Sequence, residues 1–440
     1  MRLEIGDIFI KDVQFAPKTE IKSGVLYVNK DELAKVTGDD DRIKSVEVFL
    51  AKPGESVRII PVKDVVEPRV KTDGPGGIFP GFMTGVDQVG SGRTHVLKGA
   101  AVVTTGKIVG FQEGIIDMTG TGAEYTPFSK TCNVVVKVEP TDTLKQHEHE
   151  VVVRLAGLRA SNYLGLAGKE LTPDSVRVYE TKPLLEQVAQ YPDLPKVVYV
   201  YMLQTQGLLH NTYYYGVDVK EIVPTFMYPT EAMDGAIISG NCVSACDKNP
   251  TYIHENSPVI EDLYAQHGKT INFLGCVITN ENVTLMDKER SSNQTAKLVH
   301  FLGADAAIIS EEGFGNPDAD LVMNCNKIEK LGIKTTLITD EYAGQDGASQ
   351  SLADSTPLGD ACVTAGNANE VVALPKMAVV IGYPEVADVI AGGWGAPQTL
   401  PDGKVVSASL QADGSIITEI QAITGSTNEL GYGFLTAKTI

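Results

Sequence analysis

Acidic and amide side chains follow several short apolar runs in the second half of the chain. Five such runs read as buried strands: GAIIS (235–239), INFLGCVIT (271–279), AAIIS (306–310), TTLITD (335–340) and ACVTA (361–365). Near their carboxyl ends stand Asn241 and Cys242, Asn280 and Glu281, Glu311 and Glu312, Asp340 and Glu341, and Asn367, Asn369 and Glu370. In an open parallel sheet these ends share one edge, where ligands bind. We therefore expect an acid-rich cleft that suits an ammonium group.

The same residue types also cap helices and favour turns, which alone accounts for about half of such positions. The cleft prediction therefore depends on the whole set and not on one carboxylate. The substrate-binding candidates are Glu311, Glu312, Asp340, Glu341, Asn367 and Asn369. Arg93, in GSGRTH, is a further candidate that could hold a substrate carboxylate, although a structural role for it is equally open.

Helical patterns alternate with these strands near 258–267, 288–302 and 318–331. Short continuous apolar strands that alternate with helices indicate an α/β domain with a doubly wound, mainly parallel sheet. The segment GFGNPD (313–318) lacks the third glycine of the dinucleotide fingerprint, so we interpret it as a turn.

The first half of the chain has a different pattern. Residues 1–131 mix β-branched and polar residues between glycine-rich breaks, which predicts a β-rich N-terminal domain. Residues 132–241 combine the strand NVVVKVEP, helices near 145–160 and at PLLEQVAQ, and the buried strand VVYVYML. We thus expect a β-rich part (1–131), an α/β segment (132–241) and a C-terminal α/β domain (242–440).

Charge and composition exclude several classes of function. The net charge is −19 and the pI is about 4.8, so binding to nucleic acid or to an anionic membrane is not expected. No stretch approaches the ~20 apolar residues that span a bilayer. The opening MRLEIGDIFIKD carries Glu4 and Asp7 within its first apolar run, which does not fit a secretion signal. We expect a cytoplasmic protein.

The six cysteines are scattered and form no CxxC pairs, so neither a disulfide framework nor a structural zinc site is predicted. Cys276 and Cys362 lie in apolar runs, and we interpret both as small buried hydrophobes. His147 and His149, in QHEHE, fit a solvated helix face better than a metal site.

At ISGNCVSACDKN the sequence resembles the proproteins of the substrate-binding component B of the glycine, sarcosine and betaine reductases. The resemblance runs nearly end to end, through LAKPGESVR, VGSGRTHVLKGAAVVTTGKIVGFQEGIIDM, YPTEAMDGAIISGNCVSACD, ISEEGFGNPDADLVMNC, TDEYAGQDGASQSLAD and ELGYGFLTAKTI. It implies a cut between Asn241 and Cys242 that leaves pieces of 241 and 199 residues. It also implies that Cys242 becomes a pyruvoyl group at the new N-terminus.

The chemistry of these residues fits that implication. A pyruvoyl group can arise only from a residue with a heteroatom on Cβ, which means Ser or Cys. The Cys242 sulfur would attack the Asn241 carbonyl to give a thioester, and elimination followed by hydrolysis would leave the ketone. Gly240 would help the peptide adopt the required geometry. A neighbour must activate the thiol, and His254 is the nearest titratable residue, although a structural role for it is equally open.

The resemblance also implies partners and a reaction. The protein-bound ketone is an electrophile to which a substrate amine can add. In the family, the selenolate of a small selenoprotein, component A, then displaces nitrogen at the α-carbon. Component B contains a second, selenocysteine-bearing subunit, and component C forms acetyl phosphate. Since this chain has no selenocysteine, the redox atom must come from a partner.

Glycine fits the ketone best, because a primary amine forms an imine. Sarcosine, a secondary amine, would form an iminium ion, and the quaternary nitrogen of betaine can form neither, so these remain the alternative substrates. Trp394 is the one tryptophan available for an aromatic cage, and packing explains it better. Two rival classes stay open: a pyruvoyl decarboxylase, which would release carbon dioxide without a selenoprotein, and a non-catalytic binding subunit that is never cleaved.

Substitution of Cys242 separates this chemistry from folding. Cys242→Ala removes the β-heteroatom, so we expect a folded single chain of 47.1 kDa without reductase activity. Cys242→Ser should be cleaved slowly, because a hydroxyl is far less acidic than a thiol. Mass spectrometry measures the cleavage and circular dichroism checks the fold. Cleavage of the Ala variant at the same bond would assign the cut to an external protease.

Overall fold

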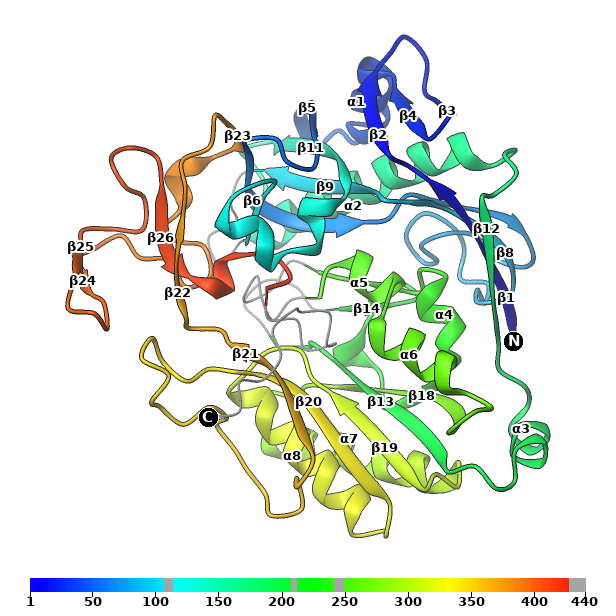
Figure 1. Cartoon of the computed structure of the whole chain (residues 1–440). Helices are drawn as coiled ribbons and strands as arrows, with labels where there is room; N and C mark the ends of the chain where they lie inside the picture. The colour runs from blue at the N-terminus through cyan, green and yellow to red at the C-terminus, as the bar shows by residue number, and fades with distance from the viewer. Residues whose placement is uncertain (107–113, 207–211, 241–248, 427–440) are drawn as a thin grey trace.

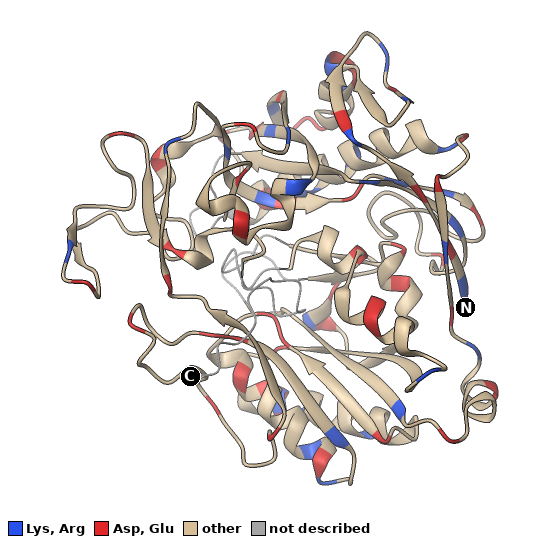
Figure 2. Cartoon of the chain, in the orientation of Figure 1, with Lys and Arg blue, Asp and Glu red and all other residues tan. Residues whose placement is uncertain are grey.

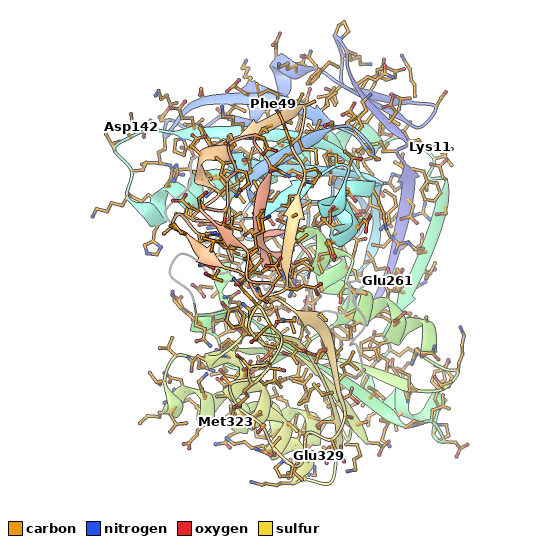
Figure 3. The ribbon with its side chains drawn as sticks, turned by 60° about the vertical axis from the view of Figure 1, so that its left-hand side comes forward. Lys11, Phe49, Asp142, Glu261, Met323 and Glu329 are labelled. Atoms are coloured by element: carbon orange, nitrogen blue, oxygen red, sulfur yellow. The ribbon has the colours of Figure 1, made fainter. Side chains whose placement is uncertain are left out.

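The computed structural model describes residues 1–106, 114–206, 212–240 and 249–426. In Figure 1 the N-terminal sheets lie above another sheet that is mainly parallel. The short helices α4, α5 and α6 lie between the two parts, on the right. In the turned view of Figure 3, Phe49 marks the upper end of the molecule and Met323 and Glu329, on α8, mark the lower end. None of the helices in the described part of the chain is long and apolar enough to cross a membrane.

The lower sheet confirms the predicted α/β class and has six strands. They are β13 (Lys196–Leu203), β16 (Thr225–Met227), β18 (Asn272–Asn280), β19 (Ala306–Ser310), β20 (Lys334–Glu341) and β21 (Cys362–Asn367). Their spatial order is β16-β18-β13-β19-β20-β21, and only β16 runs antiparallel. The strand order reverses between β13 and β19, the point where doubly wound sheets bind ligands.

One predicted strand does not belong to this sheet. GAIIS forms only the two-residue β17 (Ile237–Ile238), which pairs antiparallel with β14 (Tyr213–Tyr214) in a small separate sheet with β15 (Val217–Asp218). The central position belongs to VVYVYML, in β13, whose longer apolar run supports pairing on both sides. The prediction was wrong because two isoleucines in a short run do not show which sheet they join.

Helices cover both faces of the parallel sheet. On one face Val198, Val200 and Met202 of β13 pack in a core with α7 (Leu285–Phe301) and α8 (Asn316–Glu329). On the other face Tyr199 and Tyr201 join a core shared with the N-terminal sheets and with α4 (Pro229–Met233), α5 (Thr251–Glu255) and α6 (Pro258–Gln266). The predicted helices near 258–267, 288–302 and 318–331 are thereby confirmed.

The N-terminal part contains two larger sheets. One has the order β12-β1-β8-β7, from Ser175–Glu180, Arg2–Phe9, Gly92–Lys98 and Arg69–Asp73. The other has the order β10-β6-β9-β11-β5, from Gly114–Asp117, Val57–Val66, Ala100–Gly106, Cys132–Pro140 and Ile43–Ala51, and β23 (Val379–Gly382) adds to β6. The helix α2 (Gln146–Gly165) packs on the second sheet. Strands from beyond residue 131 therefore complete both sheets, and the three-part division of the chain stays a prediction.

Smaller elements complete the described structure. They are β2 (Asp12–Phe15), β3 (Glu20–Lys22), β4 (Val25–Val28), β22 (Val371–Leu374), β24 (Gln398–Thr399), β25 (Val405–Val406), β26 (Ile416–Glu419), α1 (Lys30–Thr37) and α3 (Leu184–Gln190). Cys276 is buried as predicted, but Cys362 is exposed, because it begins β21 at the edge of the parallel sheet.

Buried charges join the short helix α5 to the N-terminal sheets. The Arg69 guanidinium lies 2.8 Å from Glu255 Oε1 and 2.9 Å from Glu67 Oε2, and all three side chains are almost inaccessible to solvent. The Glu67 amide also donates to Glu255 Oε2, at 2.9 Å. Burial, only partly offset by Arg69, raises the pKa of Glu255 to about 8.

This raised pKa predicts a pH-dependent stability. Between the ordinary pKa of 4.5 and about 8, folded Glu255 keeps a proton that the unfolded chain releases. The Glu255 contribution is therefore complete below pH 4.5 and is lost as the pH rises through about 8. In Glu255→Gln the urea midpoint should fall less between pH 5 and 8 than in wild type, with exposed Glu186→Gln as the control. Equal slopes in all three proteins would refute the assignment.

Candidate functional site

The carboxyl ends of the parallel strands bring several predicted residues to one edge. Glu311 and Glu312 follow β19 directly, and Asp340 lies near the end of the adjacent strand β20; all three are buried. The Glu311 amide donates to Ile338 O at 3.3 Å, and the Thr339 hydroxyl donates to the Glu311 carboxylate. Figure 2 shows acidic positions in red, several of them where the parallel sheet meets the upper part of the molecule.

Glu312 lies at the point where the strand order reverses. Its Oε2 accepts the Gln204 amide N–H, from the end of β13, at 2.8 Å and the Thr212 hydroxyl at 3.2 Å. Its Oε1 accepts the Asn249 side-chain amide at 2.7 Å. Donors from three segments therefore surround this carboxyl group and fix its position.

His254, on α5, connects Glu312 to the middle of the sheet. Its Nδ1 lies 2.6 Å from the Tyr201 hydroxyl, and its Nε2 lies 3.2 Å from Glu312 Oε1, at an angle outside that of a hydrogen bond. Burial raises the pKa of Tyr201 well above its ordinary value, so the phenol keeps its proton. Which of the two groups donates in this contact depends on the tautomer of His254.

Asp64, on β6, fixes the position of α5. It accepts the Thr251 amide at 3.0 Å and the Thr251 hydroxyl at 2.7 Å. The same hydroxyl oxygen accepts the Ser239 amide N–H at 3.0 Å. Ser239 and Thr251 are therefore held side by side.

The predicted residues Asn241 and Cys242 lie outside the described residues. Gly240, just before them, is buried, and so is Asn249, which contacts Glu312. Asn249, on the downstream side of these residues, therefore meets the acidic edge of the sheet.

Glu281, at the end of β18, is the neighbour of Glu312. Its Oε1 accepts the Glu312 amide N–H at 2.7 Å, and its side chain is inaccessible to solvent. Burial, followed by the charges of Glu312, Glu311 and Asp320, holds its pKa well above the ordinary value. The edge thus combines one carboxyl whose burial raises its pKa with a second carboxyl that accepts hydrogen bonds from three donors.

The other predicted residues have structural contacts in the protein. Glu341 accepts the Thr364 hydroxyl at 2.6 Å. Asn367 accepts the Ala343 amide at 3.0 Å, and Asn369 accepts the Gly344 amide at 2.9 Å and donates to Glu419 at 3.0 Å. These two asparagines hold the loop after β20 against β26, which is the turn-forming role considered for them.

The structure does not bring Arg93 to this edge. It lies on β8 in the N-terminal part, and its Nε donates to Glu4 Oε2 at 2.8 Å. Conversely, Asp64, Tyr201 and Asn249 reach the site although they were not singled out in the sequence. Asp64 could have been recognised as an acidic residue inside an apolar strand run. Tyr201 and Asn249 are residue types that a buried strand and a turn commonly contain, so nothing in the sequence marks them as site residues.

Comparisons with known proteins agree with these features. The profile of the family described as glycine/sarcosine/betaine reductase component B subunits matches residues 1–438. The chain belongs to this family. Its members are components of oxidoreductases that deaminate their substrates reductively.

Individual relatives match over the full length of both chains. "Glycine reductase complex component B subunits alpha and beta" is 66% identical in Acetoanaerobium sticklandii and 65% identical in Peptoclostridium acidaminophilum. "Sarcosine reductase complex component B subunit alpha" of Peptoclostridium acidaminophilum is 57% identical. No solved structure matches the chain.

Neutral variants test the acidic edge. Glu312→Gln, and separately Asp340→Asn, should slow processing or turnover by about 10- to 100-fold, because each replaces a buried carboxyl at this edge and a disturbed buried polar group costs about 1–3 kcal/mol. Asp39→Asn and Asp41→Asn are suitable controls, since both residues are exposed. Asp40 in the same GDDDR turn is unsuitable, because it forms an ion pair with Arg42 at 2.8 Å. Wild-type rates in all four variants would place the site elsewhere.

Proposed function

We propose that this chain is a precursor that is cut between Asn241 and Cys242 and gives the substrate-binding subunits of a glycine reductase. The names of its relatives carry the proposal. A chain of the same length, 66% identical throughout, bears a name that contains two subunits, alpha and beta. One chain that supplies two subunits is what an internal cut would produce.

The described residues on either side of the proposed cut support its position. Each further residue extends a chain by at most about 3.8 Å, so Cys242 remains within about 7.6 Å of Gly240, measured between Cα atoms. On the downstream side, Asn249 donates to Glu312, and Thr251 donates to Asp64. The proposed cut is thus followed within ten residues by side chains that contact two buried carboxyl groups.

The proposed cofactor is a pyruvoyl group derived from Cys242. When present, it would supply a carbonyl electrophile that takes up the substrate amine. The surrounding residues fit such a group. Glu312 and His254 are side chains of a kind that transfers protons, and Tyr199 and Tyr201 are buried beside them, with stacked rings whose centroids lie 4.8 Å apart.

Glycine is the proposed substrate. Identity is higher to the glycine reductase proteins, at 66% and 65%, than to the sarcosine reductase protein, at 57%. A primary amine is also the nitrogen that adds most simply to a ketone. Trp394 is buried among Leu400 and Val406, which supports packing in place of an aromatic cage for a quaternary amine.

The proposed partners are the remaining components of the complex. They are a selenocysteine-bearing second subunit of component B, the small selenoprotein component A, and component C, which forms acetyl phosphate. Relatives named as components of a reductase complex support the existence of such partners. Because the chain itself has no selenocysteine, a partner would deliver the nucleophile.

The strand order supports two products that stay together after the cut. β13 would belong to the upstream piece, while β18 and β19, its partners on both sides, would belong to the downstream piece. A second pairing between the pieces joins β23 of the downstream piece to β6 of the upstream piece. The contact of 2.8 Å between Arg69 Nε and Glu255 Oε1 would also cross between the pieces.

The test is to isolate the active protein and to measure the mass of each polypeptide piece by mass spectrometry. We expect pieces of 241 and 199 residues that co-elute in native buffer and separate only in denaturant. The smaller piece should resist Edman degradation and react with phenylhydrazine, and Cys242→Ala provides the unreactive control. A free cysteine at the new N-terminus would exclude the pyruvoyl group.

A further inference from the structure

The backbone just before the proposed cut is held residue by residue. The two residues of β17 pair with β14. The amide N–H of Ser239, the next residue, donates to the Thr251 hydroxyl oxygen at 3.0 Å. The Ser239 hydroxyl in turn donates to the Gly240 carbonyl oxygen at 3.2 Å. All three residues are buried. The fixed backbone therefore extends to the Gly240 carbonyl, one residue before the carbonyl group at the proposed cut.

The Thr251 hydroxyl links this backbone to the N-terminal sheets. Because a backbone N–H can only donate, the Thr251 oxygen is the acceptor in the contact with Ser239. Its own proton is donated to Asp64 Oδ2, at 2.7 Å, while Asp64 Oδ1 accepts the Thr251 amide at 3.0 Å. Thr251 is the first residue of α5, and both hydrogen bonds of its hydroxyl lead out of the helix. One hydroxyl thus joins a carboxyl group of β6 to the chain before the cut.

The first step of the proposed processing requires an exact approach of two groups. The Cys242 sulfur forms a bond to the Asn241 carbonyl carbon, and the carbon–nitrogen bond between the two residues breaks. The nitrogen takes the thiol proton, so the product is a thioester with a free amine. Misplacing such reacting groups by about 1 Å costs about 100-fold in rate. A group that fixes the preceding backbone can therefore control this step without touching the reacting atoms.

We propose that Thr251 is a positioning residue for this acyl shift, with Asp64 holding its hydroxyl in place. This inference rests on the proposed function. Thr251 acts through the backbone of Ser239 and takes no part in proton transfer to the reacting groups. Its hydroxyl alone is required, since the methyl group forms none of these hydrogen bonds.

The first experiment compares two substitutions of Thr251. Thr251→Val keeps the shape of the side chain but removes the hydroxyl, so the 199-residue piece should appear about 10- to 100-fold more slowly. Thr251→Ser keeps the hydroxyl and should be processed at nearly the wild-type rate. The rate is measured by mass spectrometry of the full chain, made by cell-free synthesis and sampled over time. A wild-type rate in Thr251→Val overturns the proposal.

Thr295→Val is the matched control for a general loss of stability. Thr295 is a buried residue of α7, on the opposite face of the parallel sheet from α5. Its hydroxyl also has two contacts, with the Thr279 hydroxyl and the Ser291 carbonyl, both at 3.0 Å. The control should lower the urea midpoint as Thr251→Val does, but leave the processing rate unchanged. Equal slowing in both variants would assign the effect to stability and refute the positioning role.

The second experiment identifies the step that is slowed. Hydroxylamine cleaves thioesters and leaves ordinary amides intact, so it releases the 241-residue piece only after the acyl shift. Wild type should release this piece in hydroxylamine, as a hydroxamate. Thr251→Val should release it slowly whether the reagent is present or not. Rapid release from Thr251→Val in hydroxylamine would place the defect after the acyl shift, contrary to the proposal.

Ser239→Ala decides the question if Thr251→Val does not fold. This change removes the hydrogen bond to the Gly240 carbonyl but keeps the amide that donates to Thr251. Processing should slow about 5-fold, as expected for the loss of one ordinary hydrogen bond from the held backbone. An unchanged rate in a folded Ser239→Ala variant would show that the fixed backbone does not control the cut.

Failure of the proposed function has a different signature. In that case wild type itself stays a single chain with and without hydroxylamine, which overturns both proposals. If wild type is cleaved and Thr251→Val is cleaved at the same rate, only the role of Thr251 is excluded.

Discussion

One carboxylate, that of Asp64, ties the N-terminal sheets to the edge of the parallel sheet. It accepts two hydrogen bonds from Thr251, whose hydroxyl oxygen in turn accepts the amide of Ser239. The helix that begins at Thr251 carries His254, which reaches Tyr201 and Glu312. Removing a buried partner of this kind leaves the donors of Thr251 unsatisfied, which costs about 1–3 kcal/mol for each buried group. The contact between Ser239 and Thr251 and the position of His254 therefore depend on Asp64, a residue of a different sheet.

The two central carboxyl groups differ because their surroundings differ. Glu312 accepts hydrogen bonds from Gln204, Thr212 and Asn249. Glu281 accepts a single amide, and burial together with the acids that face it holds its pKa above the ordinary value. Two neighbouring carboxyl groups at one edge of the sheet therefore lie in different hydrogen-bonding environments.

Local sequence patterns were sufficient for the order of β18, α7, β19, α8 and β20, since each is long enough to show its periodicity. They also indicated which carboxyls meet, because parallel strands end at a common edge. Local patterns did not show which sheet GAIIS joins, because only two of its residues pair with another strand. The contacts of Asp64 with Thr251 and of Asn249 with Glu312 span 187 and 63 residues. No local pattern encodes such contacts, and Asn367 and Asn369 show that an acidic or amide residue after a strand can simply hold a loop.

The position of β13 between β18 and β19 has a consequence for how the protein can be made. Parallel strands pair only after distant segments meet, which makes such sheets slow to form. While the segments belong to one polypeptide, each has a high effective concentration near the other, and this advantage disappears when they are separate chains. A strand inserted between two strands of a partner cannot join it afterwards without opening the partner's core. Synthesis as a single chain would thus be the economical route to a two-piece protein of this topology, with division as the last step of its maturation.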